Sequence, residues 1–171
     1  MRRSFLLFGT LLCILAASAG LSALDELSGT IKQILDHRAN DFASIRKDPH
    51  VAGDETDYMS TLMVAGAKEC YITVVAKPRY SDSCQISETK NRAILTARYK
   101  KYVKALQEAS PTAWMSWTES TAKPTTESTY IGPDRAHPAA VVRWDLEGMN
   151  NDWYSQSVTF YADGYTMTKP Q

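Results

Sequence analysis

Histidine and cysteine are scarce in this chain, which has three of each among 171 residues. The chain also lacks G-x-S-x-G, H-E-x-x-H, G-x-x-x-x-G-K-[ST] and G-x-G-x-x-G, patterns that mark hydrolase nucleophiles, zinc proteases, phosphate loops and dinucleotide sites. Tetrahedral zinc takes three or four ligands, mostly imidazole or thiolate. The scattered His37, His50 and His137 do not supply them. We therefore expect no metal and no cofactor.

The chain has no excess of charge, since 19 basic residues balance 19 acidic ones. Binding to nucleic acid or to an anionic membrane surface relies on a basic excess. No apolar run reaches the ~20 residues that a membrane-spanning helix needs. We expect no nucleic-acid partner and no stable membrane insertion once the leader has been removed.

The first 23 residues have the pattern of a secretory signal peptide. Arg2 and Arg3 precede an apolar run over residues 5–17, and small residues follow. Cleavage is predicted after Ala19 or Ala23, with export to the periplasm or outside the cell. The arginine pair leaves both the general secretory and the twin-arginine routes open. Residues 24–171 are then expected to form a single domain.

Two cysteines remain after removal of the leader, and an isolated pair in an oxidising compartment indicates a disulfide. Cys70 and Cys84 are equally far from Lys77, which lies in the expected bend Lys77-Pro78-Arg79. A hairpin turning there places the two cysteines directly opposite each other, within disulfide reach. The sequence therefore predicts a structural disulfide between adjacent strands.

Two amphipathic helices are predicted from apolar residues that recur every three or four positions. The first covers residues 24–47 and ends at Asp48-Pro49. The second runs from a cap at Ser87 or Thr89 to about Ala109. One of its faces is apolar, and the other is basic, which we interpret as an ordinary solvated face. The basic residues are Lys90, Arg98, Lys100, Lys101 and Lys104.

Residues 51–57 hold three carboxylates, Asp54, Glu55 and Asp57, in what we interpret as a solvated loop. They lack the alternating oxygen ligands of a calcium loop. Strands are predicted over 58–65, 70–76, 83–87, 139–147 and 153–162. Asp163-Gly164 predicts a type I′ hairpin to a last strand at 165–168, pairing Phe160 with Met167.

Residues near 118–138 are predicted to form a mobile loop, because Thr118–Thr129 is rich in Thr, Ser, Glu and Pro. A loosely held sheet edge is the alternative for that stretch. The predicted fold class is α+β: helix, three strands, helix, three strands, with the helices packed on one face of an antiparallel sheet and one disulfide.

Three features accompany this order of elements: Asp41-Phe42-Ala43-Ser44-Ile45-Arg46 near the end of the first helix, the cysteine pair in a meander, and the C-terminal hairpin. With them, the chain resembles the type III secretion chaperone-like superfamily. The resemblance implies an α+β fold and a chaperone-like binding activity without catalysis. Cystatin-like and nuclear-transport-factor-like folds are the structural alternatives.

The sequence thus favours a small exported module that binds a protein, a peptide or an apolar ligand. Trp114 and Trp117 are the candidate binding residues, since they border the predicted loop. A small secreted hydrolase-like enzyme that uses His137 with Asp134 is the alternative function.

We expect the mature protein to begin at Gly20 or Leu24, because the small residues of the cleavage site end there. The intact mass of protein recovered from the export compartment checks this. A mass that still includes residues 1–19 would contradict it.

Overall fold

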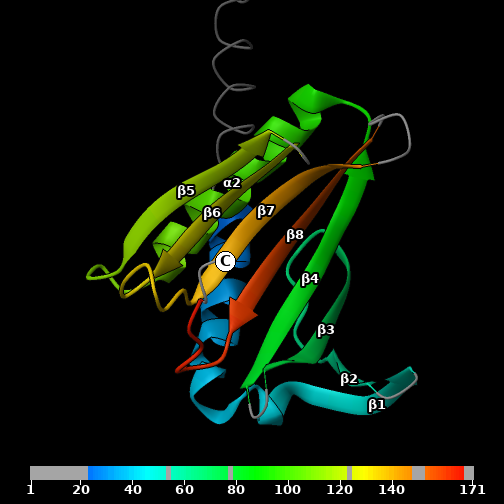
Figure 1. Cartoon of the computed structure of the whole chain (residues 1–171), viewed down its shortest axis with the longest axis vertical. Coiled ribbons are helices and arrows are strands. Elements are labelled where there is room, and N and C mark those ends of the chain that lie inside the picture. The colour runs from blue at the N-terminus through cyan, green and yellow to red at the C-terminus, as the bar shows by residue number, and fades with distance from the viewer. Residues whose placement is uncertain (1–22, 53–54, 77–78, 123–124, 148–152, 168–171) are drawn as a thin grey trace, which may run out of the picture.

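The computed structural model describes residues 23–52, 55–76, 79–122, 125–147 and 153–167. Eight antiparallel strands form one sheet in the order β1-β2-β3-β4-β8-β7-β6-β5. The strands are β1 (Arg46–Ala52), β2 (Glu55–Ser60), β3 (Ala67–Ala76), β4 (Arg79–Thr89), β5 (Met115–Ala122), β6 (Thr125–Gly132), β7 (Ala140–Glu147) and β8 (Trp153–Tyr161). An N-terminal helix, described over residues 23–36, and α2 (Arg92–Ala109) lie behind the sheet in Figure 1.

From each edge of the sheet towards its centre, the four strands follow one another in chain order. Each half of the chain is a helix followed by a meander of four strands, and the last strands, β4 and β8, pair with each other. This agrees in outline with the predicted α+β class with one disulfide. The predicted three strands per half are wrong, since each half contributes four, and strand is the dominant structure.

The prediction of one helix over residues 24–47 is wrong beyond residue 36. Two short 3-10 turns, Arg38–Asn40 and Ala43–Ile45, follow the helix, and Asp41 and Phe42 between them have left-handed φ values of 53° and 59°. Phe42 and Ile45 are nevertheless buried. The spacing of apolar residues therefore predicted correctly which side chains are buried, but it did not predict the backbone conformation. A left-handed bulky residue is unfavourable by ~1–2 kcal/mol, and burial of the Phe42 ring offsets that strain.

Strand β1 occupies the end of the predicted first helix, and β1 and β2 occupy much of the predicted loop at 51–57. Pro49 fits there because β1 is an edge strand, where a missing N–H is tolerated. Asp57 pairs with His50 in the ladder, and Glu55 pairs with Ala52. Asp54 lies outside the described residues.

The second helix lies where periodicity predicted it, with Leu95, Tyr99, Tyr102 and Leu106 buried. Its predicted caps are wrong, because Ser87 and Thr89 belong to β4. Asn91 is the cap instead: its side-chain Oδ1 accepts hydrogen bonds from the backbone N–H of Ala93 at 2.9 Å and of Ile94 at 3.3 Å.

The predicted mobile loop near 118–138 is wrong over most of its length. Residues 115–122 and 125–132 form the antiparallel pair β5 and β6, in which the Thr118 and Thr129 hydroxyls lie 2.9 Å apart. Threonine is β-branched and favours strands, so a Thr-rich composition indicated an edge strand rather than a loop. Of the described residues in that range, only 133–138 are irregular.

The C-terminal hairpin at Asp163-Gly164 is also absent. Tyr165 N–H donates to Ala162 O, but only Gly164 has a positive φ (75°), whereas a type I′ turn needs two such residues. Both edges of β8 are already paired, with β4 and β7, so no ladder is free for a further strand. Met167 N–H instead donates to Ala136 O, which excludes the predicted pairing with Phe160; Thr168 lies outside the described residues.

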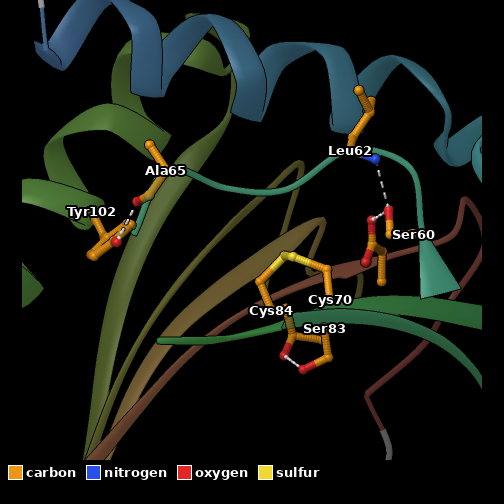
Figure 2. Close-up of a disulfide and its surroundings, with 9 residues drawn as sticks. Ser60, Leu62, Ala65, Cys70, Ser83, Cys84 and Tyr102 are labelled. Atoms are coloured by element: carbon orange, nitrogen blue, oxygen red, sulfur yellow. Dashed lines mark hydrogen bonds between the residues drawn. A yellow bond between two sulfur atoms is a disulfide. The ribbon is translucent and has the colours of Figure 1, made fainter. Parts of the chain in front are cut away.

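The predicted disulfide is confirmed. Cys70 on β3 and Cys84 on β4 are directly opposite, with Cα atoms 4.0 Å apart, and both are buried against the helices (Figure 2). The bridge joins β3 to β4, the strand of the first half that lies at the centre of the sheet. It therefore stabilises the core close to where the two halves meet.

We expect Gly66→Ala to lower the free energy of unfolding by about 2 kcal/mol, because the backbone there has a positive φ that L-residues resist. Gly66 has φ of 89°, and an added Cβ would lie 2.7 Å from the Tyr102 hydroxyl, which is held by its hydrogen bond to Ala65 O. Urea unfolding followed by tryptophan fluorescence measures the change. Gly29→Ala, on the exposed side of the N-terminal helix with open space around it, should instead raise stability slightly. Equal behaviour of the two variants would contradict this account.

Candidate functional site

Side chains of the sheet alternate between two environments. Cys84 on β4, together with Val158 and Phe160 on β8, points to the helices and is fully buried. Their neighbours along the strands point to the opposite side, which no helix of the described chain covers; Figure 1 shows this side facing the viewer. We call it the open face.

One row of side chains crosses the open face from β5 to β2. Each member is directly opposite the next in the ladder register. The row is Trp117, Tyr130, Val141, Thr159, Ser83, Tyr71 and Met59. Trp117 stacks on Tyr130 with ring centroids 5.3 Å apart. Trp117 itself is only 6% exposed, so Tyr130, which is half-buried, presents the more accessible ring of the pair.

A polar row lies beside this aromatic row. It comprises Glu119, Ser128, Arg143, Ser157, Gln85 and Glu69. The Arg143 guanidinium donates two hydrogen bonds to the Asp145 carboxylate, at 2.7 Å from Nε and 2.6 Å from Nη2, and this partner raises the pKa of Arg143. Arg143 is still 48% exposed, so its charge stays available at the surface.

A shallow depression of about 230 Å³ lies where the two rows meet. Its walls include Glu119 and Arg143, which carry opposite charges, and Tyr130 from the aromatic row. The hydroxyl-bearing residues Thr121, Thr126 and Ser128 complete its lining. The depression therefore offers a ring, two charges and hydroxyl groups within one small area.

The C-terminal segment extends the aromatic surface. Tyr165 stacks on Tyr161 with centroids 4.2 Å apart. Burial raises the pKa of Tyr161 and also that of Tyr130, and both phenols therefore stay neutral hydrogen-bonding groups at physiological pH. Sequence reasoning missed Tyr130, Arg143 and Tyr161. Period-2 alternation in β7 and β8 was the signal that could have placed Arg143 and Tyr161 on one face, whereas the Thr- and Ser-rich sequence of β6 carries no such alternation for Tyr130.

Trp114, the other predicted binding residue, lies away from the open face. The Arg38 guanidinium sits 5.2 Å from its ring centroid, donates from Nε to Tyr161 O at 2.6 Å and pairs with Asp163 at 3.1 Å. Burial lowers the pKa of Arg38, and Asp163 opposes this shift. These groups border a cleft of about 430 Å³ beside the ends of the two helices. The structure thus separates Trp114 from Trp117.

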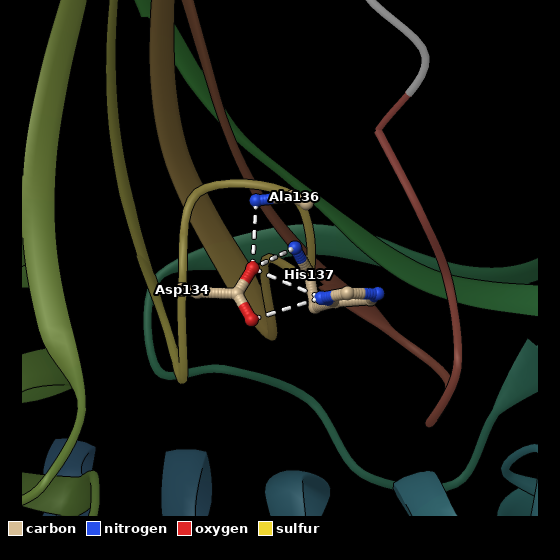
Figure 3. Close-up of polar contacts among 3 residues, drawn as sticks. All are labelled: Asp134, Ala136 and His137. Carbon is tan, nitrogen blue, oxygen red and sulfur yellow. Dashed lines mark hydrogen bonds and ion pairs between the residues drawn. The ribbon is translucent and has the colours of Figure 1, made fainter.

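The predicted pair Asp134 and His137 does come together. His137 Nδ1 lies 2.9 Å from Asp134 Oδ1, which also accepts hydrogen bonds from the backbone N–H groups of Ala136 and His137 (Figure 3). These bonds lower the pKa of Asp134. Both side chains are about half exposed. The arrangement closes a turn in the β6–β7 loop, since one carboxylate holds two backbone amides.

A buried acid lies beside the disulfide. A carboxylate oxygen of Asp82 and the sulfurs of Cys70 and Cys84 lie within 4.8 Å of one another. The sulfurs are bonded to each other, so they offer no thiolate for a metal. Ser60 donates a hydrogen bond to Asp82 Oδ2, whereas Oδ1 has no partner among the described residues. Burial raises the pKa of Asp82 to about 7, although the Ser60 hydroxyl opposes this shift.

Comparison of the chain with protein-family models, with curated proteins and with solved structures found no match. The resemblance to type III secretion chaperone-like proteins therefore stays a prediction. Within the described ranges, no helix is long and apolar enough to cross a membrane.

Asp82 makes stability depend on pH. The pKa of Asp82 is about 7 in the folded protein against 3.8 as its ordinary value, so the folded state binds the extra proton between these values. This contribution to stability is complete below about pH 4 and is lost as pH rises through about 7. We expect a loss on the order of 4 kcal/mol, at ~1.4 kcal/mol per pKa unit.

Urea unfolding of the wild type and of Asp82→Asn at a series of pH values isolates this contribution, because all other groups titrate in both proteins. The difference in unfolding free energy should change steadily between pH 4 and 7. A difference that is independent of pH over this range would show that Asp82 titrates normally.

Proposed function

We propose that this protein is an exported binding module that holds another polypeptide on its open face, a chaperone-like role without catalysis. The disulfide is compatible with an oxidising compartment outside the cytosol. The signal peptide expected over residues 1–23 lies almost wholly outside the described residues, and it supports the same location on sequence grounds.

The aromatic row is the observation that carries the proposal. Trp, Tyr and Arg are the residue types that dominate the energy of protein interfaces. Here Tyr130 and Tyr71 of the aromatic row, with Arg143 of the polar row beside them, project from strands that are paired on both sides. The buried Trp117 supports Tyr130 from edge strand β5 by stacking on its ring. Strand-mounted side chains are fixed in position before binding, so less conformational entropy is lost on association.

The dimensions of the open face favour a polypeptide over a small molecule. The aromatic row crosses seven strands, which at ~4.8 Å per strand corresponds to roughly 30 Å. The depression beside it has about 230 Å³, below the ~300–1,000 Å³ typical of small-molecule pockets. A broad surface with a shallow recess suits an extended contact.

Catalysis by His137 with Asp134 is the less favoured function. The two side chains are hydrogen-bonded, as a catalytic pair requires. However, the carboxylate also holds two backbone amides of its own loop, and both groups are widely exposed to water. We propose that the pair shapes the loop, and we expect His137→Ala to bind polypeptides like the wild type.

Peptides selected from a displayed random library on the immobilised wild type test the proposal. Tyr71→Ala and Arg143→Ala should each weaken their binding about tenfold, since loss of a hot-spot side chain exceeds ~1 kcal/mol. Ile94→Ala is the matched control: Ile94 is an exposed apolar residue (43%) on α2, away from the open face. Selected peptides that bind all three variants and the wild type equally would remove the open face as the site.

A further inference from the structure

The two edges of the sheet are built differently. An exposed edge strand presents unpaired N–H and C=O groups that can pair with another chain, and proteins commonly block it with Pro, Lys or a bulge. Edge strand β1 has all three, with Pro49, Lys47 and an irregular register between Arg46 and Pro49. That edge is protected against pairing.

Edge strand β5 has none of these features. Its sequence Met-Ser-Trp-Thr-Glu-Ser-Thr-Ala has no Pro and no Lys, and it pairs with β6 in an uninterrupted register from Met115 to Ala122. Every β5 residue except Trp117 is exposed. Glu119 is its only charge. β5 is therefore a long, regular and accessible edge.

We propose that β5 pairs antiparallel with β5 of a second copy of this chain, joining two sheets across a two-fold axis. This inference stands apart from the proposed polypeptide binding on the open face. A two-fold contact uses the unprotected edge of both copies at once and leaves only the protected β1 edges outside. The assembly therefore closes as a dimer and does not grow into a fibre.

The register of the pairing follows from the face alternation and from charge. Directly opposite residues share a face, so odd β5 positions must oppose odd positions to continue the open face. Among such registers, two pair seven residues of β5: one is centred on Thr118 and the other on Glu119. Centring on Glu119 places two carboxylates directly opposite each other, which is unfavourable. Thr118 therefore lies on the two-fold axis, and Trp117 opposes Glu119 of the other copy.

A second copy fits this edge better than an unrelated strand does. The β5 strand of a second copy has the same length. In the proposed register its only charged residue, Glu119, lies opposite the uncharged Trp117 ring rather than a like charge. The pairing also keeps both open faces on the same side of the joined sheet. The aromatic row of one copy would then end beside the Glu119 of the other.

Engineered cysteines test both the contact and its register. Opposed residues on paired strands have Cα atoms ~4.5–5.5 Å apart, within disulfide reach. Thr118→Cys should therefore form a covalent dimer under mild oxidation. Ser116→Cys and Ser120→Cys should each stay uncrosslinked alone and crosslink when mixed, because these two positions oppose each other. Crosslinking through Ser120→Cys alone, with none through Thr118→Cys, would overturn the register.

Sedimentation equilibrium of the wild type without added cysteines tests the dimer itself. We expect a concentration-dependent monomer–dimer equilibrium. Thr118→Lys should raise its dissociation constant about fivefold, since it opposes two ammonium groups on the axis. Ile94→Lys adds the same charge on α2 and should leave the equilibrium unchanged. A wild type that stays monomeric at its highest soluble concentration would overturn the proposal, whether or not peptides bind the open face.

Discussion

The antiparallel pairing of β4 with β8 is the interaction on which the rest of the structure depends. Each is the last strand of its half, and their ladder runs from Ser81 opposite Tyr161 to Thr89 opposite Tyr154. This ladder turns two separate meanders into one sheet and gives both helices a common surface to cover. A meander of four strands with one helix would bury less apolar surface on its own.

The same pairing places the chemical groups. Because β4 and β8 are central, their alternate side chains are either deeply buried or at the middle of the open face. Cys84 and Asp82 fall on the buried side, where burial raises the pKa of Asp82 to about 7. Ser83 and Thr159 fall on the other side, where their hydroxyls bond at 2.9 Å in the centre of the aromatic row. A rigid centre with a polar exposed side suits a surface for recognition.

Arg38 connects the segment after the N-terminal helix to the segment that follows β8. Its side chain reaches the carbonyl of Tyr161 and the carboxylate of Asp163, and its own carbonyl accepts from the backbone N–H of Asp163. Arginine is rarely buried without partners, and here the Asp163 carboxylate, the Tyr161 carbonyl and the Trp114 ring satisfy the Arg38 guanidinium.

Local pattern determined much of the fold. Period-2 alternation located β7 and β8, helical spacing located α2 and its buried face, and the symmetric cysteines located the β3–β4 register. These features depend on side-chain burial along a single element, which the order of residues records directly. The same reasoning found that Asp134 and His137 are neighbours, because three residues in one loop cannot lie far apart.

Tertiary structure decided the remainder. Phe42 and Ile45 kept helical spacing without a helix, because spacing reports which residues are buried but not the backbone that brings them there. The residues from Tyr165 onward could not pair with β8 as a further strand, because β8 is already paired on both sides, with β4 and β7. The aromatic row exists only through the registers of six strand pairs, and of its seven members the sequence analysis singled out only Trp117. Sequence alone determined which residues are buried and where elements lie; long-range strand pairing, which no local pattern encodes, determined which residues meet.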